Sequence, residues 1–236
     1  SCRLLPFCIS VVMCAKRPPY LIKEKLMSTN AIISAVPIVP PVNGWIEAAL
    51  SNETMRVLRG YIENSSVPCN TQLAGNLKVE KDLEDENGYF LLEVLYPLIL
   101  KYGSYFNPIG DNVPISEPKP FYLKNFWVNK QKKFEFNPLH NHAGVFSFVV
   151  WVDIPTDWRD EFKQPSVQYS NTPNASSFSM LYSDLDGQVR NMEYKMDKSR
   201  EGTMLLFPSS MLHEVYPFYT SDKDRVSISG NIFLRV

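Results

Sequence analysis

The second half of the chain is a regular series of short apolar runs separated by polar turns. Eight runs of strand length occur between residues 121 and 235. Many short strands at this spacing are typical of all-β folds, so the series predicts a double-sheet jelly roll or a barrel. The predicted strands are 121–129, 133–139, 145–153, 177–182, 188–194, 203–207, 212–218 and 225–235.

The third of these runs is expected to lie in the middle of a sheet. Residues 145–153 are apolar on both faces of the predicted strand, apart from Ser147 and Asp153. A strand that alternates strictly has one wet face, whereas a strand without alternation is covered on both faces. The sequence therefore predicts a central strand at 145–153.

The first half of the chain indicates a smaller helical part. Residues 45–50 are expected to form a short helix, and Ser51 or Asn52 can cap a second one. The clearest helix is predicted over residues 88–102, because apolar residues recur there with helical period. The apolar faces are Met55, Leu58 and Ile62 in the second helix, and Leu91, Leu92, Leu95, Leu98, Ile99 and Tyr102 in the third.

The remaining segments of the first half predict no helix. Residues 31–41 read as an edge strand that prolines end. Residues 64–82 and 104–120 carry turn-forming residues and are expected to be loops. The predicted fold class is therefore mainly β with N-terminal helices, an α+β chain.

The N-terminal segment differs from the rest of the sequence. Residues 1–26 contain an apolar run between basic residues that is shorter than the roughly 18 residues a membrane span needs. We interpret 1–26 as a leader or non-native extension, since Met27 could serve as the true start; a secretion signal is the alternative. The rest is expected to be a single domain, 27–236, with helical support at 43–102 and the β core at about 121–236.

Charge and cysteine content exclude some classes of protein. The formal net charge is -1, which gives no global field toward nucleic acid or an anionic membrane. The basic stretch 124–136 is interpreted as two strands joined by a charged turn, so nucleic acid is not an expected partner. Only Cys69 lies beyond the first fifteen residues, so no disulfide framework is indicated. The expected location is the cytoplasm, which would be that of a host cell if the gene is viral.

The histidines point to a metal. The chain has 3 histidines, and two of them, His140 and His142, are separated by one residue. Side chains two residues apart in an extended chain point to the same side. His213, which also lies in strand-like sequence, could complete the set, and neutral imidazole is a good ligand for iron, zinc and nickel. The alternative is a polar strand end with His213 elsewhere.

The last predicted strand carries a polar face that includes a cation. Arg225, Ser227, Ser229 and Asn231 alternate with apolar residues and therefore share one side of the strand. A guanidinium in a polar interior needs an anionic partner, which a carboxylate ligand could supply with Ser227 at its side. The alternative partner is an internal Asp or Glu.

These motifs, taken in order, resemble those of the Fe(II)- and 2-oxoglutarate-dependent oxygenases, most closely a branch found in phages and marine bacteria. The resemblance covers about 110 residues clearly and the helices from 44 to 102 loosely. The matching motifs are Trp127-Val128-Asn129, His140-Asn141-His142, Gly202-Thr203-Met204-Leu205-Leu206-Phe207-Pro208-Ser209, His213, and Arg225-Val226-Ser227-Ile228-Ser229-Gly230-Asn231.

The resemblance implies a double-stranded β-helix core with His140 and His213 bound to Fe(II). It implies that Arg225, helped by Ser227, pairs with the distal carboxylate of 2-oxoglutarate, and Asn129 of the Trp-x-Asn motif is expected at the same site. The implied reaction uses O2, converts 2-oxoglutarate to succinate and oxidises a C–H bond of a substrate, as in hydroxylation.

One departure from the usual pattern concerns the third ligand. The usual triad has a carboxylate two residues after the first histidine, and this chain has His142 there. We expect His142 to be the third ligand, which would leave the metal more positively charged than a carboxylate would. The alternative donors of a carboxylate are Glu135, Asp153 and Asp184.

Two other functions stay open on the sequence. One is a non-catalytic jelly-roll module, such as a viral structural or carbohydrate-binding protein. The other is a cupin-type metalloenzyme that uses three histidines without 2-oxoglutarate. The sequence names neither the primary substrate nor the oligomeric state.

Overall fold

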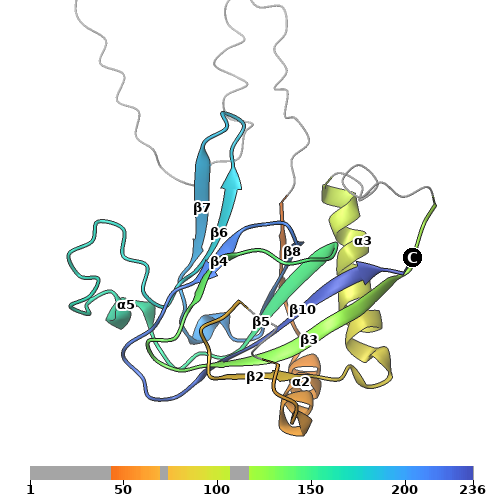
Figure 1. The fold of residues 1–236 in the computed structure, drawn as a ribbon, viewed down its shortest axis with the longest axis horizontal. Coiled ribbons are helices and arrows are strands. Elements are labelled where there is room, and N and C mark those ends of the chain that lie inside the picture. The colour runs from red at the N-terminus through yellow and green to blue at the C-terminus, as the bar shows by residue number, and fades with distance from the viewer. Residues whose placement is uncertain (1–43, 70–73, 107–116, 236) are drawn as a thin grey trace, which may run out of the picture. The chain divides into compact units, whose positions relative to one another are not determined.

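The fold of the chain was obtained as a computed structural model, which describes residues 44–69, 74–106 and 117–235 (Figure 1). The expected leader at 1–26 and the expected edge strand at 31–41 lie outside the described residues. None of the helices described is both long enough and apolar enough to span a membrane.

Two antiparallel sheets make up most of the fold, which confirms the predicted mainly β jelly roll (Figure 1). The larger sheet has the strand order β1-β8-β5-β10-β3-β2, and the smaller has the order β4-β9-β6-β7. In chain order the strands are β1 (Ile46–Ala49), β2 (Val79–Asp82), β3 (Phe121–Gln131), β4 (Asn137–His140), β5 (Phe146–Asp153), β6 (Phe178–Ser183), β7 (Val189–Tyr194), β8 (Thr203–Pro208), β9 (His213–Val215) and β10 (Arg225–Leu234).

Each of the eight predicted runs contains a strand, but two of these strands are shorter than predicted. The run 133–139 begins only at Asn137, because the chain first turns through Phe134, whose φ is 70°. Glu135 closes that turn: its backbone N–H donates to Lys132 O (3.1 Å) and its carboxylate accepts from the Lys132 backbone N–H (2.9 Å). The run 212–218 keeps only the three residues of β9.

The two edges of the larger sheet correct the expectations for the first half. Residues 45–50 form strand β1 rather than a helix, and β1 pairs antiparallel with β8. A helix of this length gains few hydrogen bonds for its nucleation cost, whereas the open edge of β8 supplies partners along the segment. Strand β2, inside the expected loop 64–82, pairs with β3 at the opposite edge.

Helix α2 (Asn52–Asn64) confirms the predicted cap. Ser51 accepts a hydrogen bond from the backbone N–H of Thr54 at 3.1 Å, which satisfies one of the free donors of the first turn. The face that α2 buries includes Leu58 and Tyr61.

The helix predicted over 88–102 is present but changes its winding. A 3-10 turn (Glu86–Gly88) leads into a π-helical segment (Leu91–Leu95), which continues as α3 (Tyr96–Tyr105). A π-turn holds more residues per turn and so shifts the buried face. Leu92 is therefore 59% exposed, against expectation, while Phe90 and Val94 are buried beside Leu95.

Strand β5 separates the two apolar cores, as its two-sided apolar sequence predicts. Its position between β8 and β10 is central. Phe146, Phe148, Val150 and Val152 pack with the helices in one cluster. Val149 and Trp151 pack in a second cluster with residues of the smaller sheet. The inner side of β5 thus faces the space between the sheets, which holds the site.

Candidate metal centre and co-substrate cavity

A cavity of about 330 Å³ lies between the two sheets. Strands of the larger sheet line one wall with polar residues, and strands of the smaller sheet bring the histidines to the other. The antiparallel register sets the polar wall, because residues opposite each other on paired strands share a face. The opposed pairs from β10 and β3 are Arg225 with Gln131, Ser227 with Asn129, Ser229 with Trp127, and Asn231 with Asn125.

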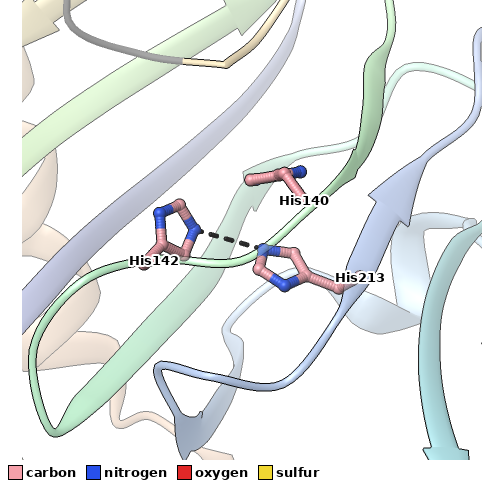
Figure 2. A group of neighbouring side chains, drawn as sticks. All are labelled: His140, His142 and His213. Atoms are coloured by element: carbon pink, nitrogen blue, oxygen red, sulfur yellow. Dashed lines mark hydrogen bonds between the residues drawn. The ribbon is translucent and has the colours of Figure 1, made fainter.

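The three histidines meet at this cavity (Figure 2). His140 ends β4 and lies opposite His213, the first residue of β9, while His142 follows β4 in the loop toward β5. One nitrogen of each ring can be chosen so that all three lie within 4.8 Å of one another. The ring centroids are 4.3 Å apart for His140 and His213, 4.9 Å for His140 and His142, and 5.0 Å for His142 and His213.

Backbone contacts fix the loop that carries His142. Its N–H donates to Ser209 O at 2.8 Å, which ties the loop to the end of β8. Gly144 then turns with φ 110°, and a Cβ there would lie 2.8 Å from Ile232 O. Only glycine suits such a position, so the turn delivers His142 to the cluster without strain.

Hydrogen bonds to backbone carbonyls orient the other two rings. His140 Nδ1 lies 2.6 Å from Pro138 O, and His213 Nδ1 lies 3.0 Å from Met211 O. A carbonyl accepts only, so each Nδ1 carries the proton and each Nε2 keeps a lone pair. His142 Nε2 lies 3.2 Å from His213 Nε2 and must donate to it here, so metal binding requires the His142 proton to sit on Nδ1 instead.

Burial keeps the cluster neutral. It lowers the pKa of His142 to about 4 and that of His213 to about 3, with the neighbouring His140 ring adding to both shifts. Burial also lowers the pKa of His140. The rings therefore hold lone pairs rather than positive charge at neutral pH. Three converging neutral imidazoles fit a divalent transition metal such as Fe(II).

The carboxylates considered as alternative ligands lie elsewhere. Asp153 pairs with Arg59 (2.9 Å), and Asp184 pairs with Arg190 (2.7 Å). Glu135 accepts from the backbone N–H groups of Lys78 and Lys132. Within the described ranges, the group of possible metal ligands consists of the three histidines alone.

Arg225 is buried at the cavity and bound by neutral groups. Its side chain is 3% exposed, and no carboxylate of the described residues forms an ion pair with its guanidinium. The expected alternative, a salt bridge to an internal acid, is therefore not what the described residues form. Burial lowers the pKa of Arg225 to about 10, and the charge of the buried Glu161 partly opposes this; the guanidinium stays charged at neutral pH.

The polar residues beside Arg225 form a connected row. Asn129 donates through Nδ2 to Ser229 Oγ (3.2 Å) and to Ser227 Oγ (3.4 Å). Trp127 Nε1 donates to Asn129 Oδ1 at 3.0 Å. Arg225, Ser227 and Asn129 thus lie together on one wall of the cavity.

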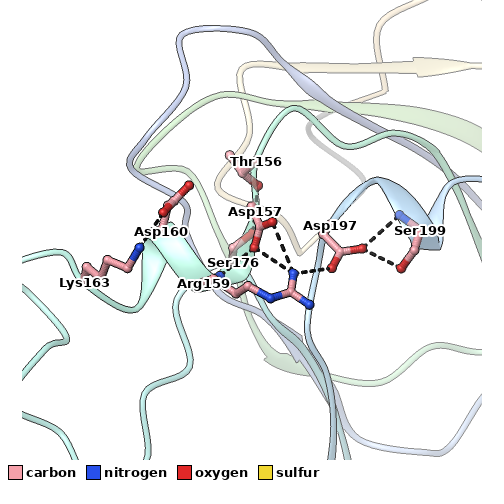
Figure 3. Close-up of polar contacts among 8 residues, drawn as sticks. All are labelled: Thr156, Asp157, Arg159, Asp160, Lys163, Ser176, Asp197 and Ser199. Carbon is pink, nitrogen blue, oxygen red and sulfur yellow. Dashed lines mark hydrogen bonds and ion pairs between the residues drawn. The ribbon is translucent and has the colours of Figure 1, made fainter.

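A second polar cluster lies around Ser176, which is one of the hydrogen-bond partners of Arg225 (Figure 3 draws the cluster). Arg159, in the short helix α5 (Trp158–Glu161), bridges Asp157 and Asp197 with contacts of 3.1 Å to each. Thr156, next to Asp157, lies 3.2 Å from Ser176 Oγ. Ser176 in turn accepts from Arg225 Nη1 through its carbonyl oxygen at 2.7 Å. These contacts hold the segment that binds the outer side of the guanidinium.

Gln131 and Glu80 are among the cavity residues that the sequence did not indicate. Gln131 accepts from Arg225, and the alternation of polar residues along β3 could have identified it. Glu80 lies on β2, opposite Asn129, and its side chain is 1% exposed. Burial, with the charge of Glu135, raises the pKa of Glu80 to about 7. No signal pointed to Glu80, because its segment reads as a loop.

The segment that builds the cavity matches a known family. Residues 125–231 match the family model described as "Putative 2OG-Fe(II) oxygenase". The comparison with curated proteins gives no match.

Solved structures with a similar arrangement include oxygenases of low sequence identity. A prolyl-4-hydroxylase from Pseudomonas putida is 17% identical, with 82% of this chain and 94% of that chain covered and a TM-score of 0.46. A 2OG-Fe(II) oxygenase-family oxidoreductase from Burkholderia pseudomallei is 11% identical, with 80% and 85% covered and a TM-score of 0.48. A viral collagen prolyl hydroxylase from Paramecium bursaria Chlorella virus-1, solved with 2-oxoglutarate, is 9% identical, with 80% and 94% covered and a TM-score of 0.47.

The family match confirms the predicted reaction class and its cofactors, Fe(II) and the co-substrates 2-oxoglutarate and O2. The matched segment contains all three histidines and Arg225. Over residues 125–231 this chain is therefore similar to the 2OG-Fe(II) oxygenase family.

Proposed function

We propose that His140, His142 and His213 hold Fe(II), and that Arg225, Ser227 and Asn129 bind the distal carboxylate of 2-oxoglutarate. The reaction is the hydroxylation of a substrate C–H bond, in which O2 and 2-oxoglutarate yield succinate and CO2. The observation that supports this assignment most directly is the meeting of three neutral imidazoles and a buried cation in one cavity. Bound Fe(II) supplies the redox chemistry with O2.

The protein contributes position and charge to this reaction. The three imidazoles would hold the metal, which would then be able to bind the keto acid and O2. Arg225 provides a charged hydrogen-bond donor for a carboxylate from a side chain that is itself buried, and such a charge-assisted bond is strong. Ser227 and Asn129 add neutral polar groups beside it. The apolar residues Val149, Trp151 and Phe207 line another part of the cavity.

The proposal is tested by anaerobic titration of the protein with Fe(II) and 2-oxoglutarate. Chelation of the metal by the keto acid is expected to give a visible charge-transfer band. His213→Ala should abolish this band, because it removes one of three ligands. Arg225→Ala should retain metal but require at least about tenfold more 2-oxoglutarate, since a charge-assisted pair contributes about 1.5–3 kcal/mol.

Leu139→Ala is a suitable control, because Leu139 neighbours His140 but is 46% exposed. It should keep both the metal and the band. If the unaltered protein binds metal fully and gives no band with 2-oxoglutarate, the proposed function is wrong.

One observation favours a second candidate, a three-histidine metalloenzyme that does not use 2-oxoglutarate. Five hydrogen bonds to neutral acceptors already engage the five N–H donors of Arg225. Under this alternative the guanidinium only braces the fold. Arg225→Ala would then leave metal-dependent activity unchanged in any fraction of protein that folds.

We also propose that residues 27–236 act as one domain in the cytoplasm. The described residues between 44 and 235 belong to one compact unit, and Cys69 is a buried free thiol, which suits a reducing compartment. Fractionation of cells that express the tagged protein tests the location: recovery from a secreted or periplasmic fraction would reject it.

A further inference from the structure

Gln131 occupies the side of Arg225 that faces the cavity. Its Oε1 accepts from Arg225 Nε at 3.1 Å and from Arg225 Nη2 at 2.6 Å. The other acceptors, Ser176 and the Tyr216 carbonyl, are not among the cavity-lining residues, whereas Gln131 and Arg225 both are. The amide oxygen thus takes the two-donor edge of the guanidinium, which a carboxylate would take in a bidentate pair.

The orientation of this amide follows from its partners. Arginine has donors only, so the group facing it must be the oxygen of Gln131. The amide nitrogen faces two carbonyl oxygens, Glu135 O at 2.5 Å and Tyr216 O at 3.5 Å. The partners of both atoms therefore agree that Oε1 faces Arg225 and Nε2 faces the carbonyl oxygens.

We infer that the Gln131 side chain is a stand-in for the distal carboxylate of 2-oxoglutarate, and that it leaves Arg225 when the co-substrate binds. This inference rests on the proposed role of Arg225. The backbone carbonyls that hold the outer side of the guanidinium cannot move away without moving strands and loops. The Gln131 oxygen can leave by side-chain rotation while Nε2 keeps its bond to Glu135 O.

The exchange gives the site a preference among keto acids. A carboxylate forms a charge-assisted pair with the guanidinium, which is stronger than the bond from a neutral amide. When a dicarboxylate displaces Gln131, the guanidinium therefore exchanges a weaker hydrogen bond for a stronger one, and the exchange favours binding. A keto acid without a distal carboxylate has nothing to offer Arg225, so Gln131 stays and such acids bind through the metal alone.

The test changes the stand-in into a permanent carboxylate. Gln131→Glu should pair with Arg225 and compete with the co-substrate from within the protein. In protein loaded with Ni(II), titration calorimetry should show 2-oxoglutarate binding at least about tenfold weaker than in the unaltered protein, with Ni(II) affinity unchanged. Gln131→Leu, which offers no acceptor, should bind 2-oxoglutarate as tightly or more tightly.

Asn125→Asp is the matched control for added charge. Asn125 lies on the same strand and lines the same cavity, but it faces Asn231 rather than Arg225. Its variant should bind 2-oxoglutarate within about threefold of the unaltered protein. Equal weakening by Asn125→Asp and Gln131→Glu would overturn the inference, because charge alone would explain it.

The remaining outcomes separate the inference from the function on which it rests. If the unaltered protein binds 2-oxoglutarate and Gln131→Glu binds it equally well, only the inference fails. Tenfold weaker binding by Gln131→Leu would also overturn it, since Gln131 would then hold the carboxylate rather than replace it. If the unaltered Ni(II) protein does not bind 2-oxoglutarate, the proposed function itself fails.

Discussion

Among the residues that line the cavity, Glu80 is the carboxyl group whose ionisation the folded protein opposes most clearly. Burial and Glu135 raise its pKa from 4.5 to about 7. The folded protein therefore holds this proton more tightly than the unfolded chain does. The stabilising effect of protonation is complete at pH values below the pKa of Glu80 in the unfolded chain. It is lost as the pH rises through the pKa of Glu80 in the folded protein.

We therefore expect Glu80→Gln to reduce the pH dependence of stability in the metal-free protein. Between pH 5 and pH 8 the free energy of unfolding of the unaltered protein should fall relative to that of the variant, by roughly 2 kcal/mol. Urea denaturation at the two pH values measures this difference. Glu53→Gln, on the exposed side of α2, is the control and should track the unaltered protein. Parallel pH profiles for Glu80→Gln and the unaltered protein would contradict the prediction.

At the scale of elements, the contact between β10 and its two neighbours depends on a glycine. A Cβ at Gly230 would lie 2.6 Å from Asn125 O on β3 and 2.6 Å from the Phe148 ring on β5. The carbonyl belongs to the strand pairing and cannot move aside cheaply. A side chain here would have to push apart the strands that carry the polar wall.

Gly230→Ala is accordingly expected to destabilise the protein by about 1–3 kcal/mol. Gly60→Ala provides the contrast, because no atom lies within 4 Å of a Cβ there and Gly60 is inside α2. It should stabilise by about 0.5–1 kcal/mol, since alanine favours helix. Thermal unfolding of both variants tests the pair. If the Gly230→Ala protein is as stable as the unaltered one, the prediction is wrong, because β3 and β5 would then have moved apart to admit the Cβ without loss of stability.

At the scale of the whole molecule, the proposed ligands connect the two sheets. His140 and His213 belong to the smaller sheet, and Arg225 belongs to the larger. A co-substrate that spans from the metal to Arg225 would therefore stabilise the folded state by linking them. At 100 times the dissociation constant, each ligand adds about 2.7 kcal/mol.

The melting temperature should thus rise with Ni(II) and rise again when 2-oxoglutarate is added with it. 2-Oxoglutarate without metal should produce a much smaller shift. His213→Ala should lose the metal-dependent part while it still folds. A second rise of full size in His213→Ala would mean that the dicarboxylate binds without the histidine cluster.

The sequence predicts the strands of the core and the residues of the cavity better than it predicts the edges. A run that is apolar on both faces identifies β5, alternation identifies β10, and the spacing of His140 and His142 anticipates their meeting. Strand β1 was expected to be helical because only its pairing with β8, which is not visible in local sequence, makes it extended. Alternation along β3 can place Gln131 on the cavity face, but its contact with Arg225 depends on the register of β3 and β10, which local sequence does not show.

Strand β5 has a consequence for how variation in this chain should be interpreted. Its even-numbered side chains pack with the helical layer, and of these Phe148 also lines the cavity, whereas Val149 and Trp151 line the cavity from the opposite face of the strand. Neighbouring residues of β5 therefore differ in role: one packs against the helices and the next faces the cavity. Selection for stable folding would act mainly on the residues that face the helices, and selection for substrate choice mainly on the residues that face the cavity. The two properties can therefore change separately within one strand.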